Sequence, residues 1–146
     1  MFIHILLGKK VLLISGEKED HEVVENQKLI PEQFFETFLV KKEIQVEDLI
    51  TVLNSESNKT SLFEMQNKES LKSGFTILKS QFDIIIVDIT SLQNINRAKE
   101  WLLFTEKNIA VFEAGKSIDE KSSENLDYIK NHEGFIGWIL NKAVEV

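Results

Sequence analysis

The sequence of 146 residues contains no cysteine, which excludes a disulfide framework, a thiolate nucleophile and a zinc–thiolate site. It has one proline and six glycines, and no stretch has the composition of an interdomain linker. No apolar run reaches the roughly 18–20 residues that a membrane span needs. The opening MFIHILL is apolar but lacks the flanks of a signal peptide. We therefore expect one globular domain over residues 1–146.

Positive charge is also scarce in this chain. Lysine and arginine number 17 against 24 acidic residues, and the net charge is −7. Nucleic acids and anionic membranes both need a basic face on their partner, so neither is expected to bind directly. The absence of cysteine fits a reducing compartment.

Four short apolar segments predict buried β-strands, and a fifth segment is a weaker candidate. They are mostly apolar rather than alternating, which is typical of a parallel sheet covered on both faces by helices. The four are VLLIS (11–15), IIIVD (84–88), IAVFE (109–113) and FIGWIL (135–140), and the fifth is SLFEM (61–65). We expect Ile86, in the middle of the most apolar segment, to be fully buried.

Helical periodicity lies between the predicted strands. Leu71, Phe75 and Leu78 recur at helical spacing, and so do Leu92, Ile95, Ala98 and Leu102. A further helix is expected to start at the capping box Ser117-x-x-Glu120 and to close at Gly134. Pro31 suits the first turn of PEQFFETFL, whose Phe34, Phe35 and Phe38 form a core cluster or, alternatively, a protein interface. The alternation predicts an α/β fold of three layers, doubly wound around a mostly parallel sheet.

Ligands of such sheets bind at the carboxyl ends of the strands. The first strand ends at Ser15-Gly16-Glu17, the second at Asp88, the third at AGKS (114–117) and the last at Asn141. Asp88 is either a magnesium ligand or a carboxylate that accepts hydrogen bonds from the following turn. Asn141 has a similar alternative, as a polar residue that caps a strand end.

The segments GKKVLLI, FDIIIVDITSL, IAVFEAGKSIDE and GFIGWILNKA occur in this order along the chain. Together they resemble the cytoplasmic domain of the bacterial tyrosine autokinases of capsule and exopolysaccharide export, which belong to the deviant-Walker P-loop ATPases. The resemblance covers nearly the whole chain and implies a Rossmann-like, P-loop-NTPase-like fold. It implies that Asp88 matches the third acidic motif, and that Asn141 matches an asparagine near the nucleotide base.

The chain departs from the pattern of this family in three ways. It has no Gly-rich P-loop with a lysine and a Ser/Thr, as if truncated at the N-terminus. Ser15, Gly16 and Glu17 stand where the family has an Asp-x-Asp pair. The only tyrosine, Tyr128, lies inside a predicted helix, and no terminal tyrosine cluster follows it. We therefore expect no catalytic residues, no bound Mg²⁺ or ATP, and a vestigial nucleotide site at Ser15, Glu17, Asp88 and Asn141, with Asp88 as the metal candidate.

The resemblance suggests a non-catalytic, pseudokinase-like module that acts as a scaffold or regulator in capsule or exopolysaccharide biosynthesis and export. The implied partners are an inner-membrane polysaccharide co-polymerase or a second copy of the chain. The implied location is the cytoplasm, with a tether to the inner membrane through a partner or an upstream segment. One alternative is a receiver-like signalling domain with Asp88 as phosphoacceptor and Lys116 as the late lysine. Another is an ATPase completed by a P-loop supplied elsewhere.

The remaining candidates have simpler structural interpretations. His4, His21 and His132 share no ligand spacing and are expected to be structural or surface residues, and Trp101 and Trp138 core or half-buried aromatics. If the P-loop strand is missing, residues 84–88 could pair directly with 109–113 while MFIHILL forms a short helix, which we favour. The alternative is that residues 2–7 form a strand, either in a hairpin with the strand at 11–15 or with a second copy of the chain.

Overall fold

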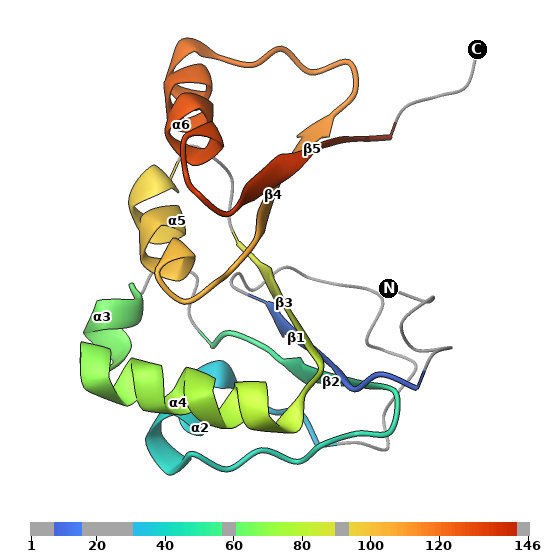
Figure 1. Cartoon of the computed structure of the whole chain (residues 1–146), viewed down its shortest axis with the longest axis vertical. Coiled ribbons are helices and arrows are strands. Elements are labelled where there is room, and N and C mark those ends of the chain that lie inside the picture. The colour runs from blue at the N-terminus through green and yellow to red at the C-terminus, as the bar shows by residue number, and fades with distance from the viewer. Residues whose placement is uncertain (1–7, 16–30, 57–60, 90–93, 143–146) are drawn as a thin grey trace. The chain divides into compact units, whose positions relative to one another are not determined.

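The computed structural model describes residues 8–15, 31–56, 61–89 and 94–142 (Figure 1). The chain divides into two compact units, residues 1–89 and 90–146. Each unit contains its own parallel sheet and its own helices, and each is described separately below.

A three-stranded parallel sheet forms the centre of the first unit. Its order is β2 (Ile50–Leu53), β1 (Val11–Ser15) and β3 (Ile84–Asp88). Residues of β1 pair on one side with β2, from Val11↔Ile50 to Ile14↔Leu53, and on the other side with β3. The central position explains why Leu12 and Ile14 have no exposed surface. The strands predicted at 11–15 and 84–88 are confirmed.

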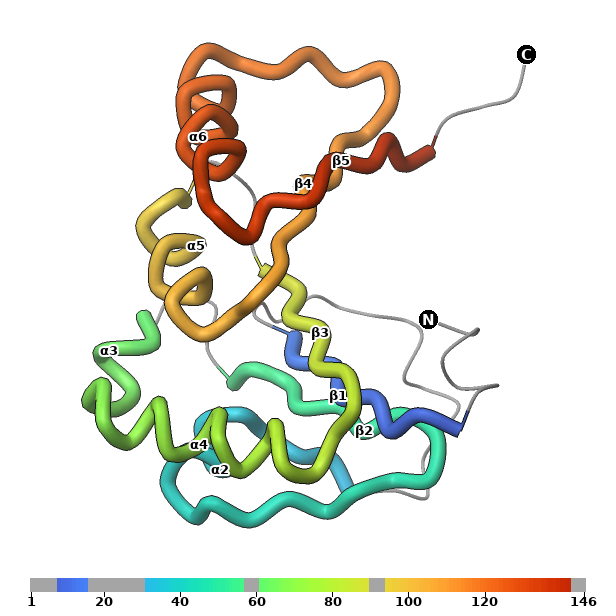
Figure 2. Tube along the Cα trace, viewed as in Figure 1, coloured from blue at the N-terminus to red at the C-terminus, as the bar shows by residue number. Residues whose placement is uncertain are grey.

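The helices of this unit are α2 (Phe35–Lys41), α3 (Leu62–Met65) and α4 (Lys68–Gln81), and Figure 2 traces the path of the chain through them. Helices α2 and α4 pack together where Gly74 of α4 leaves room, because an added Cβ there would lie 3.3 Å from Leu39 Cδ2. The ring of Phe35 lies 6.0 Å from that of Phe75, and both are buried. The phenylalanine cluster is therefore core at Phe35 and Phe38, while Phe34 is half-buried.

Three local predictions for the first unit are wrong. The segment 61–65 forms the helix α3, because Ser61 and Glu64 make a capping box that satisfies two free backbone N–H groups. The predicted set of strands omits β2. Pro31 precedes rather than begins its helix: Phe34 is an extended N-cap, and the backbone N–H of Phe35 donates to Asn54 O at 2.9 Å.

One prediction for the strand at 84–88 is wrong, because Ile86 is 37% exposed and not fully buried. Within its own unit, β3 is an edge strand of the sheet. Residues 84–88 pair with β1 and residues 109–113 pair with β5, and the expected pairing between these two segments, which would join the two units, stays a prediction. Both edges of β1 are occupied, so β1 has no edge for a hairpin, and residues 1–7 lie outside the described ranges.

The second unit contains a two-stranded parallel sheet, β4 (Asn108–Glu113) and β5 (Phe135–Asn141), with the helices α5 (Ile95–Leu102) and α6 (Glu120–Lys130). The register runs from Ile109↔Gly137 to Glu113↔Asn141, after an irregularity at Asn108. The strands predicted at 109–113 and 135–140 are confirmed, as are Ala98 and Leu102 as buried positions of α5. Leu92 lies outside the described residues.

The boundaries of α6 differ from the prediction. Its N-cap is Asp119, whose side chain accepts from Ser122 N, so the cap is not the predicted box of Ser117 and Glu120. The helix ends at Lys130, and Gly134 has a different role: a Cβ there would lie 2.5 Å from the backbone oxygen of Glu106. Gly134 therefore permits a close backbone approach before β5.

None of the helices that the structure describes is long and apolar enough to cross a membrane.

Candidate functional site at the carboxyl ends of the strands

The first unit brings together two of the predicted site residues. Ser15 and Asp88 are register partners at the carboxyl ends of β1 and β3. Neighbouring strands lie about 4.8 Å apart, and partner residues of a parallel pair project from the same face. Ser15 is buried, with 7% of its surface exposed, and Asp88 is exposed. Gly16 and Glu17 lie outside the described residues.

This pair offers one neutral hydroxyl and one carboxylate to a ligand. Magnesium in phosphoryl-transfer sites is held by one or two carboxylates together with substrate phosphates. Within the described ranges, no group of three or more His, Asp or Glu side chains could hold a metal ion. A serine hydroxyl does not replace the charge of an aspartate, so the described residues of this edge offer a cation one carboxylate, that of Asp88.

Asn141 lies in the second unit, in register with Glu113 at the ends of β5 and β4. Its side-chain oxygen accepts a hydrogen bond of 2.9 Å from the backbone N–H of Lys142, which has a left-handed φ of 56°. Its backbone oxygen accepts a second hydrogen bond, from Ala114 N at 2.9 Å. These bonds match the interpretation of Asn141 as a polar cap of the strand end.

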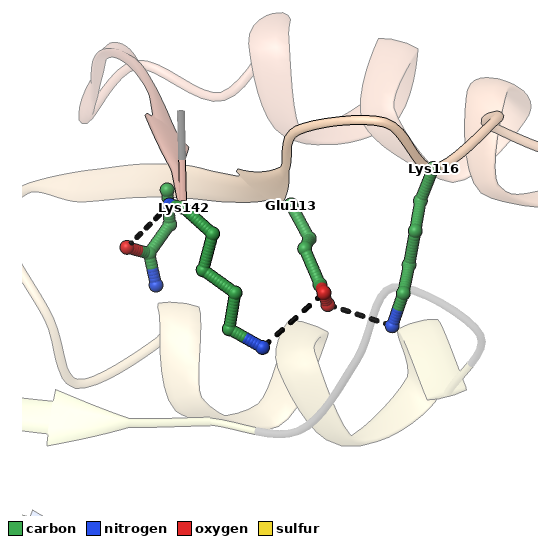
Figure 3. A network of polar contacts seen from close by, with 4 residues as sticks. Glu113, Lys116 and Lys142 are labelled. Carbon is green, nitrogen blue, oxygen red and sulfur yellow. Dashed lines mark hydrogen bonds and ion pairs between the residues drawn. The ribbon is translucent and has the colours of Figure 1, made fainter. Parts of the chain in front are cut away.

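Glu113 is the centre of a charge cluster that sequence reasoning missed (Figure 3). Its carboxylate contacts Lys116 Nζ at 2.6 Å and Lys142 Nζ at 3.2 Å. The side-chain hydrogen bond from Lys116, followed by that from Lys142, holds the pKa of Glu113 below its ordinary value. Lys116, the late lysine of the receiver alternative, is thus engaged with a carboxylate of its own unit.

The AGKS loop forms one side of an open pocket in the second unit. The pocket has a volume of about 370 Å³, and Trp138, Leu140 and Phe112 of the two strands form an apolar wall. The rings of Phe112 and Trp138 meet edge to face, with centroids 6.3 Å apart. Gly115 has a φ of +81°, which lets the loop turn tightly beside this wall.

The tryptophan and histidine candidates differ in burial and in hydrogen bonding. Trp101 is buried in its unit, whereas Trp138 is 62% exposed and is not the core or half-buried residue that we predicted. His132 has a structural role, because its Nδ1 accepts from the backbone N–H of Gly134 at 3.2 Å and lies 3.3 Å from Asn108 Nδ2. His4 and His21 lie outside the described residues.

These features define an α/β protein with parallel sheets whose polar groups gather at the carboxyl ends of the strands. The crystal structure of the chimerical protein CapA2B2 has a similar fold: the TM-score is 0.75 at 16% sequence identity, over 97% of this chain and 66% of that one. This similarity confirms the predicted α/β, Rossmann-like fold class. No family model matches the chain, and no curated protein matches it either.

Proposed function

We propose that the chain is a non-catalytic relative of the capsule-export tyrosine autokinase domain and acts as a scaffold or regulatory module of polysaccharide export. One observation carries this proposal. The segments that resemble the family contain the strands β1, β3, β4 and β5, with Ser15 and Asp88 in register at two strand ends, in a fold similar to that of CapA2B2. The family relationship is inferred from this combination of motif order and fold.

The chemistry of the strand ends supports a non-catalytic role. Phosphoryl transfer depends on backbone N–H groups that cradle the phosphates and on charges that neutralise the transition state. The 146 residues contain no Gly-rich loop followed by lysine and a Ser/Thr. Where the resemblance implies an Asp-x-Asp pair, the chain has Ser15, Gly16 and Glu17. Of these, Ser15 is described by the structure; it is buried and in register with Asp88, the residue that matches the third acidic motif.

A role through protein contacts suits the surface of the second unit. On one face of the β4–β5 pair, Ile109, Val111 and Ile139 are 48%, 61% and 51% exposed. Exposed apolar side chains on one face of a sheet are typical of a surface that another protein covers. We propose an inner-membrane polysaccharide co-polymerase or a second copy of the chain as the partner, at the cytoplasmic side of the membrane.

Genetic complementation in the cell that expresses this chain tests the proposal, with surface polysaccharide as the readout. Deletion of the chain should lower the amount of surface polysaccharide or change its chain length. Reintroduction of either the unaltered chain or Asp88→Asn should restore it fully, because a scaffold does not need the carboxylate. A chain that hydrolyses ATP with Mg²⁺ in vitro, and loses this turnover in Asp88→Asn, would contradict the proposal.

A further inference from the structure

The open pocket of the second unit has a chemistry that the proposed function does not use. Trp138 and Leu140 of β5 and Ile118 of the loop between β4 and α6 line it, and their exposed fractions are 62%, 50% and 50%. Leu126 of α6 lines it as well. Scattered apolar residues on a surface need no explanation, but an apolar concavity with an exposed tryptophan is a favourable place for an apolar ligand.

Two lysines give this apolar pocket a positive rim. Lys116 and Lys130 both line it, one from the AGKS loop and one from the last turn of α6. The ammonium of Lys130 is 4.0 Å from the Asp127 carboxylate, and both side chains are at least half exposed. Exposed ion pairs of this kind contribute little free energy, so a ligand anion can replace the carboxylate with little loss.

The one carboxylate of the pocket does not make it negative. Glu113 lies between Lys116 and Lys142, which contact its two oxygens. Its charge is therefore balanced by two cations, and Lys130 adds a third cation to the lining of the pocket. The local charge is positive although the whole chain has a net charge of −7.

We propose that this pocket binds an amphiphilic anion, which is an aromatic ring or short apolar chain that carries one carboxylate, phosphate or sulfonate group. The apolar part contacts Trp138, Leu140 and Leu126, and the anionic group contacts Lys116 and Lys130. The volume of about 370 Å³ lies at the lower end of the range for small-molecule pockets, which favours a compact ligand over a folded partner. The inference goes beyond the proposed function and does not depend on it.

Two dyes that differ by one sulfonate test the inference on the full chain. The anionic dye is 8-anilinonaphthalene-1-sulfonate, and the neutral dye is N-phenyl-1-naphthylamine. We expect one saturable site for the anionic dye. The double variant Lys116→Gln, Lys130→Gln should weaken its binding about tenfold, because the variant loses the charge-assisted contacts with the sulfonate. Binding of the neutral dye should change by less than about twofold, because apolar burial has no charge dependence.

Matched variants assign the site. Lys121→Gln removes an exposed charge of α6 that does not line the pocket, and Ile139→Ala removes an exposed side chain of β5 outside it. Neither should affect either dye, whereas Trp138→Ala should weaken both. The inference is overturned if the anionic dye shows no saturable site, if the double lysine variant binds it unchanged, or if Ile139→Ala weakens it as much as Trp138→Ala. The lysine substitutions are at exposed side chains, so this test does not depend on a variant that disturbs packing.

Discussion

Leu12 and Ile86 lie on neighbouring strands, but only Leu12 is fully enclosed. Leu12→Ala should lower the free energy of unfolding by about 2–5 kcal/mol, from lost transfer energy and a cavity. Ile86 is 37% exposed, so Ile86→Ala should cost only about 1.5 kcal/mol, which corresponds to three carbons that are partly buried. Urea unfolding of the two variants would measure the difference. Equal losses would mean that a covering partner buries Ile86 in solution.

Glu113 gives the second prediction at the scale of a residue. Its pKa is lowered from 4.5 by Lys116 first and Lys142 second. Because the pKa is lower in the folded state, the ion pairs contribute their full stability at pH values above the pKa of the unfolded state. This contribution is lost as the pH falls through the pKa of the folded state. Carboxyl chemical shifts measured by NMR should therefore titrate below pH 4.5, and Lys116→Gln should move that midpoint upward. The control Lys121→Gln should leave it in place.

The start of α4 depends on one side chain. Asn67 is the N-cap, and its Oδ1 accepts from the backbone N–H of Ser70 at 2.9 Å. Asn67→Ala should lower the free energy of unfolding by about 1 kcal/mol, because it leaves this N–H without the cap. Asn67→Asp keeps an acceptor and adds a charge that the helix N-terminus favours, so it should remain as stable as the original. Thermal unfolding by circular dichroism distinguishes the two, and a loss in both variants would contradict the capping role.

Elements with a dominant local signal could be predicted from the sequence. The apolar runs at 11–15 and 84–88 form strands, and the spacing of Leu71, Phe75 and Leu78 forms a helix. The segment 61–65 could not be assigned by its apolar content, because the capping box of Ser61 decides its conformation. The burial of Ile86 depends on where β3 lies in the sheet, and the residues of a single strand do not determine the order of the strands.

Some residues of the candidate site could also be predicted from the sequence, and others could not. Ser15 and Asp88 were predictable because each ends an apolar strand, and parallel strands bring such ends to one edge. The contact of Glu113 with Lys142 spans 29 residues and arises from the register of β4 with β5. The only advance signal was that Glu113, like Asp88, follows an apolar run. The pocket beside it requires the placement of α6, which no motif specifies.

At the scale of the whole molecule, charge decides which large partners are excluded. The net charge of −7 predicts that duplex DNA is not bound at about 0.15 M salt, because non-specific binding requires a basic face that releases counterions. Fluorescence anisotropy of a labelled 20-base-pair duplex should stay flat as the protein is added. A rise that disappears at higher salt would reveal a basic surface strong enough to overcome the net charge.

The register of Ser15 with Asp88 determines whether the stability of this fold depends on magnesium. In Ser15→Asp, a second carboxylate would occupy a position only 7% exposed, directly beside the first. Burial and the neighbouring charge would both raise its pKa, and each unit of that rise costs about 1.4 kcal/mol at neutral pH. We expect this variant to melt earlier than Ser15→Asn, and millimolar Mg²⁺ to recover part of the difference. Equal melting of the two variants in a chelator would refute this. With serine at this position, we expect folding to be independent of divalent cations; with aspartate, the supply of magnesium would decide how much of the protein is folded.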